Sequence, residues 1–139
     1  MSLVGHSRGA MTIGNAMTSL ERLPDATGSL YNTDIKIVGP AYNAQTMANQ
    51  LDRLSEGFAQ GVNLQNHADG FVGTLIGGNP ATYDQRPNDS SKIKETVKIF
   101  GDAPTVHSCY GTGAVDRDGC ISNYGMAPTM NVQPNHTLK

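Results

Sequence analysis

The sequence predicts an α/β domain whose mostly parallel sheet has about four strands with flanking helices. Short apolar stretches typical of strands alternate with longer stretches of helical periodicity, and Gly or Pro stands at several of the changes between them. The chain has 139 residues, 16 glycines and 37% hydrophobic residues. That length and composition are typical of one loop-rich globular domain with a single core.

Strands are expected where apolar residues alternate or form a short run, and helices where they recur every three or four positions. Pro24 should end the first helix, because proline cannot continue a helix and disfavours helical geometry in the residue before it. Residues 71–76 fit either a strand or a short buried helix. The other expected elements are a strand at 2–5, a helix after it that stops near Arg22, a strand at 34–39, a helix at 44–56, and strands at 62–66 and 96–100.

Two long loops and a tail separate or follow these elements. Residues 77–92 are rich in Gly, Asn, Pro, Asp and Ser and are expected to form a surface loop, and residues 101–119 form another. From residue 123 onward the sequence has no periodicity, so we expect a flexible tail at 123–139 unless another part of the molecule docks it.

The segment Gly5-His6-Ser7-Arg8-Gly9 matches the pattern Gly-x-Ser-x-Gly and lies between the first strand and the first helix. In a nucleophile elbow, the serine sits on a strained turn that lifts its hydroxyl clear of the sheet, and small flanking residues let strand and helix approach closely. Gly5 and Gly9 suit that need. The turn also places Ser7 near a helix N-terminus, so the N–H of Arg8 is expected to be one oxyanion donor. We predict that Ser7 is a nucleophile, with an ordinary turn as the alternative.

A serine nucleophile needs a histidine base and a carboxylate that orients the histidine. Asp69 follows the strand at 62–66 and His107 follows the strand at 96–100, so both are expected at the carboxyl edge of the sheet. Several alternatives stay open. Asp69 precedes a glycine and also suits a turn; Asp102 is a second candidate acid, and His67 and His136 are other candidate bases.

The chain resembles the C-terminal half of a serine α/β-hydrolase of the lipase or esterase kind. Beyond the elbow, three segments are similar to the acid, post-acid and histidine segments of hydrolase-like domains near the C-termini of bacterial filamentous-haemagglutinin-type exoproteins: 66–73, 77–82 and 106–111. The resemblance covers most of residues 2–111, and only the elbow is a widely shared motif.

This resemblance implies that residues 1–122 form the C-terminal half of an α/β-hydrolase-like domain, without the strands that precede the elbow. Ser7 would attack a small-molecule or lipid ester or another acyl group, His107 would transfer the proton, and Asp69 would orient His107. The family order Ser, Asp, His is kept. No cofactor is needed. Because the second oxyanion donor usually comes from an earlier loop, we expect weak activity.

The same resemblance implies that the strand before the elbow has one unpaired edge. The free N–H and C=O groups of such an edge can form hydrogen bonds with another strand. We expect residues 1–5 to pair with a second copy, giving a homo-oligomer, or with a missing N-terminal half, or to be disordered. The alternative function is a noncatalytic structural or interaction module at the C-terminus of a secreted bacterial adhesin or toxin.

The net charge indicates which other partners to expect, and the cysteines indicate where in or outside the cell the protein is expected. Ten basic and twelve acidic residues give a net charge of −2 without a basic cluster, so nucleic acid is not an expected partner. We expect neither a transmembrane segment nor a signal peptide. No metal site is expected, because His67 and Asp69 lack further ligands at suitable spacing.

Cys109 and Cys120 bracket a loop that a disulfide would close, with two free thiols as the alternative. We therefore expect a secreted or cell-surface protein, with the cytoplasm as the alternative.

Overall fold

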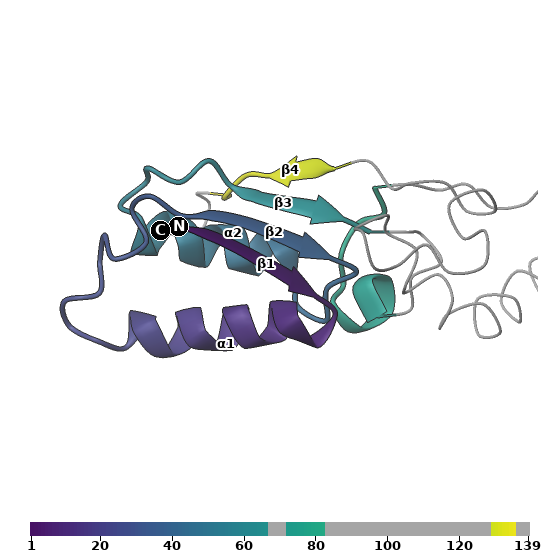
Figure 1. The fold of residues 1–139 in the computed structure, drawn as a ribbon, viewed down its shortest axis with the longest axis horizontal. Helices are drawn as coiled ribbons and strands as arrows, with labels where there is room; N and C mark the ends of the chain where they lie inside the picture. The colour runs from purple at the N-terminus through teal and green to yellow at the C-terminus, as the bar shows by residue number, and fades with distance from the viewer. Residues whose placement is uncertain (67–71, 83–128, 136–139) are drawn as a thin grey trace, which may run out of the picture.

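The computed structural model describes residues 1–66, 72–82 and 129–135 of the chain. In these ranges, a four-stranded sheet is combined with two α-helices and one π-helix (Figure 1). The strands are β1 (Ser2–His6), β2 (Asp34–Val38), β3 (Val62–Gln65) and β4 (Met130–Val132). The helices are α1 (Arg8–Glu21), α2 (Ala44–Leu54) and the π-helix η1 (Val72–Ile76). None of these helices is long and apolar enough to cross a bilayer.

The described strands follow the order β1-β2-β3-β4 in the sheet. β1, β2 and β3 are parallel, and β4 runs antiparallel to β3. The predicted α/β arrangement with a mostly parallel sheet is therefore confirmed. His6 pairs with Val38, and Val38 pairs with Gln65, so the three parallel strands end level with one another. Their carboxyl ends form one edge of the sheet, and Ser7, Gly39 and Asn66 are the first residues beyond it.

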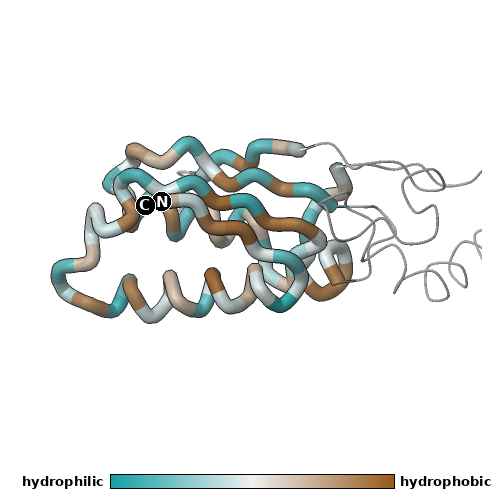
Figure 2. Tube along the Cα trace, in the orientation of Figure 1, coloured by the Kyte–Doolittle hydropathy of each residue, from teal (hydrophilic) through white to brown (hydrophobic). Residues whose placement is uncertain are grey.

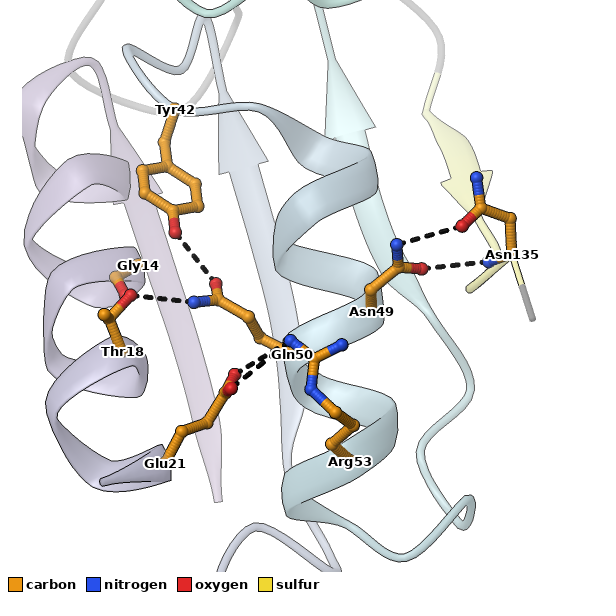
Figure 3. A network of polar contacts seen from close by, with 8 residues as sticks. All are labelled: Gly14, Thr18, Glu21, Tyr42, Asn49, Gln50, Arg53 and Asn135. Atoms are coloured by element: carbon orange, nitrogen blue, oxygen red, sulfur yellow. Dashed lines mark hydrogen bonds and ion pairs between the residues drawn. The ribbon is translucent and has the colours of Figure 1, made fainter. Parts of the chain in front are cut away.

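The core lies between the sheet and its two α-helices, which share one face of the sheet (Figure 3). Because successive strand residues point to opposite faces, alternate residues of β2 and β3 face the helices. Ile35, Ile37, Val62 and Leu64 are at most 1% exposed. The alternation of hydrophobic and hydrophilic residues is visible along these strands in Figure 2. This alternation sets which face of the sheet the helices cover.

Helix α2 begins at a capped N-terminus and packs along an apolar stripe. The Oδ1 atom of Asn43 accepts a hydrogen bond from the N–H of Thr46 at 2.9 Å, which satisfies one of the free donors of the first turn. Met47, Leu51 and Leu54 recur at helical spacing and are buried. These features explain why the sequence forms a helix here and which side of it faces the sheet.

Polar side chains join α1 to α2 at two places along the two helices (Figure 3). Gln50 of α2 is 5% exposed; it accepts a hydrogen bond from the Tyr42 hydroxyl at 2.9 Å and donates one to Oγ1 of Thr18 at 2.8 Å. Nearer the surface, Arg53 and Glu21 form an ion pair at 3.1 Å. The two helices are thus held in register by a buried amide and by an exposed ion pair.

Three segments refine or depart from the sequence-based expectations: the end of α2, the run at 71–76 and the tail. Helix α2 ends at Leu54, two residues before the expected end, and Glu56 follows with a φ of 56°. The ambiguous run at 71–76 contains η1, closed by a hydrogen bond from the N–H of Gly77 to the carbonyl of Val72 at 2.8 Å. The expected strand at 96–100 lies outside the described residues.

The third departure is in the expected flexible tail, because residues 130–132 of that tail form β4. Side chains of α2 also contact this segment: Gln45 donates to the carbonyl of Gln133 at 2.8 Å, and Asn49 donates to Oδ1 of Asn135 at 3.0 Å (Figure 3). Residues 129–135 are therefore docked on β3 and α2, which is the condition under which order was expected.

Candidate active site

Ser7 occupies the turn between β1, which ends at His6, and α1, which begins at Arg8. Its backbone has φ 56° and ψ −118°. A positive φ is uncommon for a residue with a Cβ atom, and holding such a conformation costs about 1–3 kcal/mol. The Gly-x-Ser-x-Gly segment therefore forms a strained strand-to-helix turn with the serine at the strained position.

Three backbone hydrogen bonds hold Ser7 in this conformation. Its N–H donates to the carbonyl of Val38 at 3.1 Å, and its own carbonyl accepts from the N–H of Ala10 at 3.2 Å and of Ala41 at 3.1 Å. Two of these partners belong to β2 and the turn after it, which are distant in sequence. The neighbouring strand therefore stabilises the strained turn, as is required for such a conformation to persist.

The two glycines of the motif differ in their surroundings. A Cβ atom on Gly5 would lie 2.8 Å from the backbone nitrogen of Ala10 and 2.9 Å from Cδ1 of Ile13, so β1 and α1 approach too closely for any side chain there. A Cβ atom on Gly9 would meet nothing within 4 Å. The steric role expected for both glycines thus applies to Gly5 and not to Gly9 within the described structure.

The side chain of Ser7 is half-buried and does not cap α1. Arg8 is the first residue of α1, so no earlier turn of helix accepts its N–H. Unpaired N–H groups and the helix dipole at this end favour negative charge. This turn therefore combines a serine side chain that is not used for capping with a backbone N–H of the kind that an oxyanion needs.

Two strands away, Asn66 is the first residue after β3 and is fully buried. Its backbone exchanges two hydrogen bonds with Thr82, at 2.9 and 2.7 Å, and its Nδ2 donates to Oγ1 of Thr74 and to the carbonyl of Pro80. Within the described residues, Oδ1 of Asn66 has no hydrogen-bond partner and lies against Gly73, where a Cβ atom would be 2.0 Å away. Residues 72–82 are thus folded back onto the carboxyl end of β3.

Asn79 connects this segment to the turn after β2. It is 4% exposed; its Oδ1 accepts from the N–H of Ala44 at 2.6 Å, and its Nδ2 donates to the carbonyls of Tyr42 at 3.0 Å and Gly73 at 3.1 Å. Asn43 adds hydrogen bonds from its Nδ2 to the carbonyls of residues 77 and 78. The turn that supports Ser7 is therefore bonded directly to the segment that follows Asp69 in the chain.

Sequence reasoning did not single out Asn66 or Asn79 as residues that organise this edge. The available signal was weak: Asn79 stands between two glycines and a proline, which together predicted only a loop. The other residues considered for the site or for a disulfide lie outside the described residues: Asp69, His107, Cys109, Cys120, His67, Asp102 and His136. Only the elbow half of the predicted site is therefore described by the structure.

In the described ranges, no three His, Cys, Asp or Glu side chains gather as a metal site would require. No protein-family model, no curated protein and no solved structure matches this chain. The strained strand-to-helix turn at Ser7 is therefore the feature that points to a function.

Proposed function

We propose that this protein is a serine hydrolase that cleaves a carboxylic ester or another acyl group, with Ser7 as nucleophile, His107 as base and Asp69 as the orienting acid. The observation that carries the proposal is the backbone of Ser7, with φ 56° in the turn between a parallel strand and the helix that follows it. A nucleophile elbow uses this strand–turn–helix arrangement to expose a serine hydroxyl.

The strain at Ser7 favours a catalytic role over an ordinary turn. Glycine adopts a positive φ at no steric cost, and Asn tolerates it better than most residues. A turn selected only for its shape has no need of a serine, and the Ser7 side chain does not cap the helix. Strain that the surrounding structure maintains is a feature of functional sites, so the strained backbone of Ser7 supports a catalytic role for this residue.

The proposed reaction uses the elbow as follows. Ser7 Oγ attacks the acyl carbon while His107 takes the hydroxyl proton, and His107 then gives that proton to the leaving group. Asp69 holds the imidazole in the correct tautomer. The N–H of Arg8 donates to the oxyanion of the tetrahedral intermediate, an interaction for which loss of one donor typically costs about 10²–10³ in turnover. Water then releases the acyl group by the reverse sequence.

The position of Asn66 supports the choice of Asp69 as the acid. Asp69 follows Asn66 by three residues, and Asn66 lies at the carboxyl end of β3, two strands from Ser7. Parallel neighbours are about 4.8 Å apart, so the ends of β1 and β3 are separated by about 10 Å. That separation leaves room for an imidazole between a serine hydroxyl and a carboxylate.

The test is covalent labelling of the whole chain with a fluorophosphonate, which reacts with activated serines. We expect one adduct on Ser7 in the wild-type protein and none in Ser7→Ala. Ser19→Ala is the matched control, because Ser19 is exposed on α1 and should not affect labelling. His107→Ala and Asp69→Asn should each slow labelling without unfolding the protein.

Absence of labelling at Ser7 in a folded wild-type protein would overturn the proposal. That result would favour the alternative, a noncatalytic structural or interaction module that keeps the elbow without turnover. The resemblance to bacterial exoprotein domains, the secreted or cell-surface location and the Cys109–Cys120 disulfide stay predictions in either case.

A further inference from the structure

The edge of β1 that faces away from β2 presents backbone groups to a further strand. The N–H of Asp34 donates to the carbonyl of Met1, and the N–H of Ser7 donates to the carbonyl of Val38. In a parallel ladder, alternate residues of a strand bond to the same neighbour. The odd-numbered residues 1–7 therefore face β2, whereas Ser2 and Val4 turn their N–H and C=O groups outward. In the described sheet, β1 is an edge strand.

An apolar groove of about 380 Å³ lies directly beside this edge. Its lining comes mainly from Leu3 of β1 and from one side of α1. The α1 residues Ile13, Ala16, Met17 and Leu20 recur at the spacing i, i+3, i+4, i+7, which is the stripe that one helix buries against a partner. Ala16 is exposed, and Ile13 and Leu20 are only partly covered by the described chain. The described chain thus covers this apolar stripe of α1 only in part.

We propose that a second copy of this chain covers the groove, through antiparallel β1–β1 pairing and α1–α1 packing about one two-fold axis. In such an interface, both copies use the same surface, so it must be self-complementary. Residues 2–5 carry no charged side chain, and no like charges would face each other across the paired strands. The open N–H and C=O groups of Ser2 and Val4 would be satisfied by the same groups of the second copy.

The charges of α1 fit the same arrangement. Arg8 and Glu21 are its only formally charged residues and lie at its two ends. Antiparallel packing brings Arg8 of each helix toward the end of its partner at which Glu21 is paired with Arg53, so the two Arg8 side chains do not face each other. The small side chain of Ala16 near the middle of the stripe permits the close approach of 8–10 Å between axes that packed helices need. Strand pairing and helix packing therefore act together at one interface, independently of the proposed chemistry at Ser7.

The test is the molar mass of the full chain, measured by size-exclusion chromatography with light scattering over micromolar concentrations. We expect a dimer. Ala16→Glu places two carboxylates beside each other in the interface and should weaken the dimer at least tenfold. Asn15→Glu is the matched control, because Asn15 is exposed on α1 beside the groove lining and should leave the dimer intact. Circular dichroism establishes that both variants are folded.

A second pair of variants tests the strand contact without touching the helix. Val4→Pro removes an outward N–H from an edge strand, a position that tolerates proline, whereas Val4→Ala keeps the N–H. We expect Val4→Pro to be monomeric and Val4→Ala to remain dimeric, with the Val4 amide protected from hydrogen exchange only in the dimer. A wild-type monomer throughout the concentration range would overturn the proposal. A dimer that is insensitive to both Ala16→Glu and Val4→Pro would also overturn it, since its interface would lie elsewhere.

Discussion

The carbonyl oxygen of Ser7 accepts a hydrogen bond from the backbone N–H of Ala41, with 3.1 Å between the two atoms. Ala41 belongs to the turn after β2, so a segment distant in sequence holds the proposed nucleophile in place. The same turn is bonded to Asn79, which follows η1 in the chain. The strained conformation of Ser7 is therefore maintained by tertiary structure and not by the Gly-x-Ser-x-Gly segment alone.

Replacing Ser7 should separate stability from activity. Ser7→Gly removes the Cβ atom that makes a φ of 56° unfavourable, whereas Ser7→Ala keeps it. We expect Ser7→Gly to have a free energy of unfolding about 1 kcal/mol higher than Ser7→Ala, measured by urea denaturation. Both variants should lose fluorophosphonate labelling. Equal stability of the two variants would mean that the positive φ stores no strain.

The two glycines of the motif should respond oppositely to alanine. Gly5→Ala puts a methyl group 2.8 Å from the backbone nitrogen of Ala10, so strand and helix must separate, and we expect a loss of about 1–3 kcal/mol in the free energy of unfolding. Gly9→Ala meets no atom within 4 Å in a helix, and we expect it to stabilise the protein by up to about 1 kcal/mol. Thermal unfolding of the two variants measures both effects. If Gly9→Ala is as destabilising as Gly5→Ala, the free space around Gly9 does not determine the effect of a side chain there.

Local sequence patterns were sufficient for the first five elements of the fold. From β1 to β3 the predicted and observed boundaries agree within about two residues, because period-2 and period-3.6 patterns report directly on which face is buried. They were insufficient for η1, whose short apolar run is compatible with several conformations. They also missed β4, because its hydrogen bonds depend on β3, with Asn131 bonded to Asn63 across 68 positions.

The strand–turn–helix arrangement around Ser7 was predictable because its determinants are local: a small residue, a serine and a following helix are contiguous in sequence. Its support was not predictable. The hydrogen bond from Ala41 to Ser7 and the contacts of Asn66 depend on how three strands align at one edge. No periodicity in a single segment reports on that alignment. The pairing of Ser7 with Asp69 and His107 stays a prediction from sequence.

The buried amide and the exposed ion pair between α1 and α2 should differ in their contribution to stability. Gln50→Ala removes a buried amide that bonds two part-buried groups, the Tyr42 hydroxyl and Oγ1 of Thr18, and we expect a loss of about 2 kcal/mol in the free energy of unfolding. Arg53→Ala removes an ion pair whose Arg side chain is 56% exposed, and we expect a loss below about 1 kcal/mol that falls further with added salt. Urea denaturation at low and high salt distinguishes the two. A salt-dependent loss of several kcal/mol for Arg53→Ala would contradict this ranking.

Asn79 should contribute most to holding residues 72–82 in place at the carboxyl ends of the parallel strands. Asn79→Ala removes the acceptor of the Ala44 N–H and the donor to the carbonyls of Tyr42 and Gly73, all in a buried environment. We expect a loss of about 2–3 kcal/mol in the free energy of unfolding, since several buried groups lose their partner together. We also expect faster amide exchange in residues 72–82, which Asn79 bonds to the turn after β2.

Asn79→Asp separates the acceptor role of the Asn79 side chain from its donor role. The carboxylate still accepts from the N–H of Ala44 and suits the positive end of α2, yet it has no hydrogen to donate to the carbonyls that Nδ2 of Asn79 bonds. Oxygen would then face oxygen in a buried site, so the aspartate should not rescue the loss seen with alanine. Stability equal to that of the wild type in Asn79→Asp would show that the acceptor role is the only one that matters. If the proposed chemistry is correct, both variants should also slow the labelling of Ser7, because the turn that holds its carbonyl loses a direct connection to the segment after Asp69.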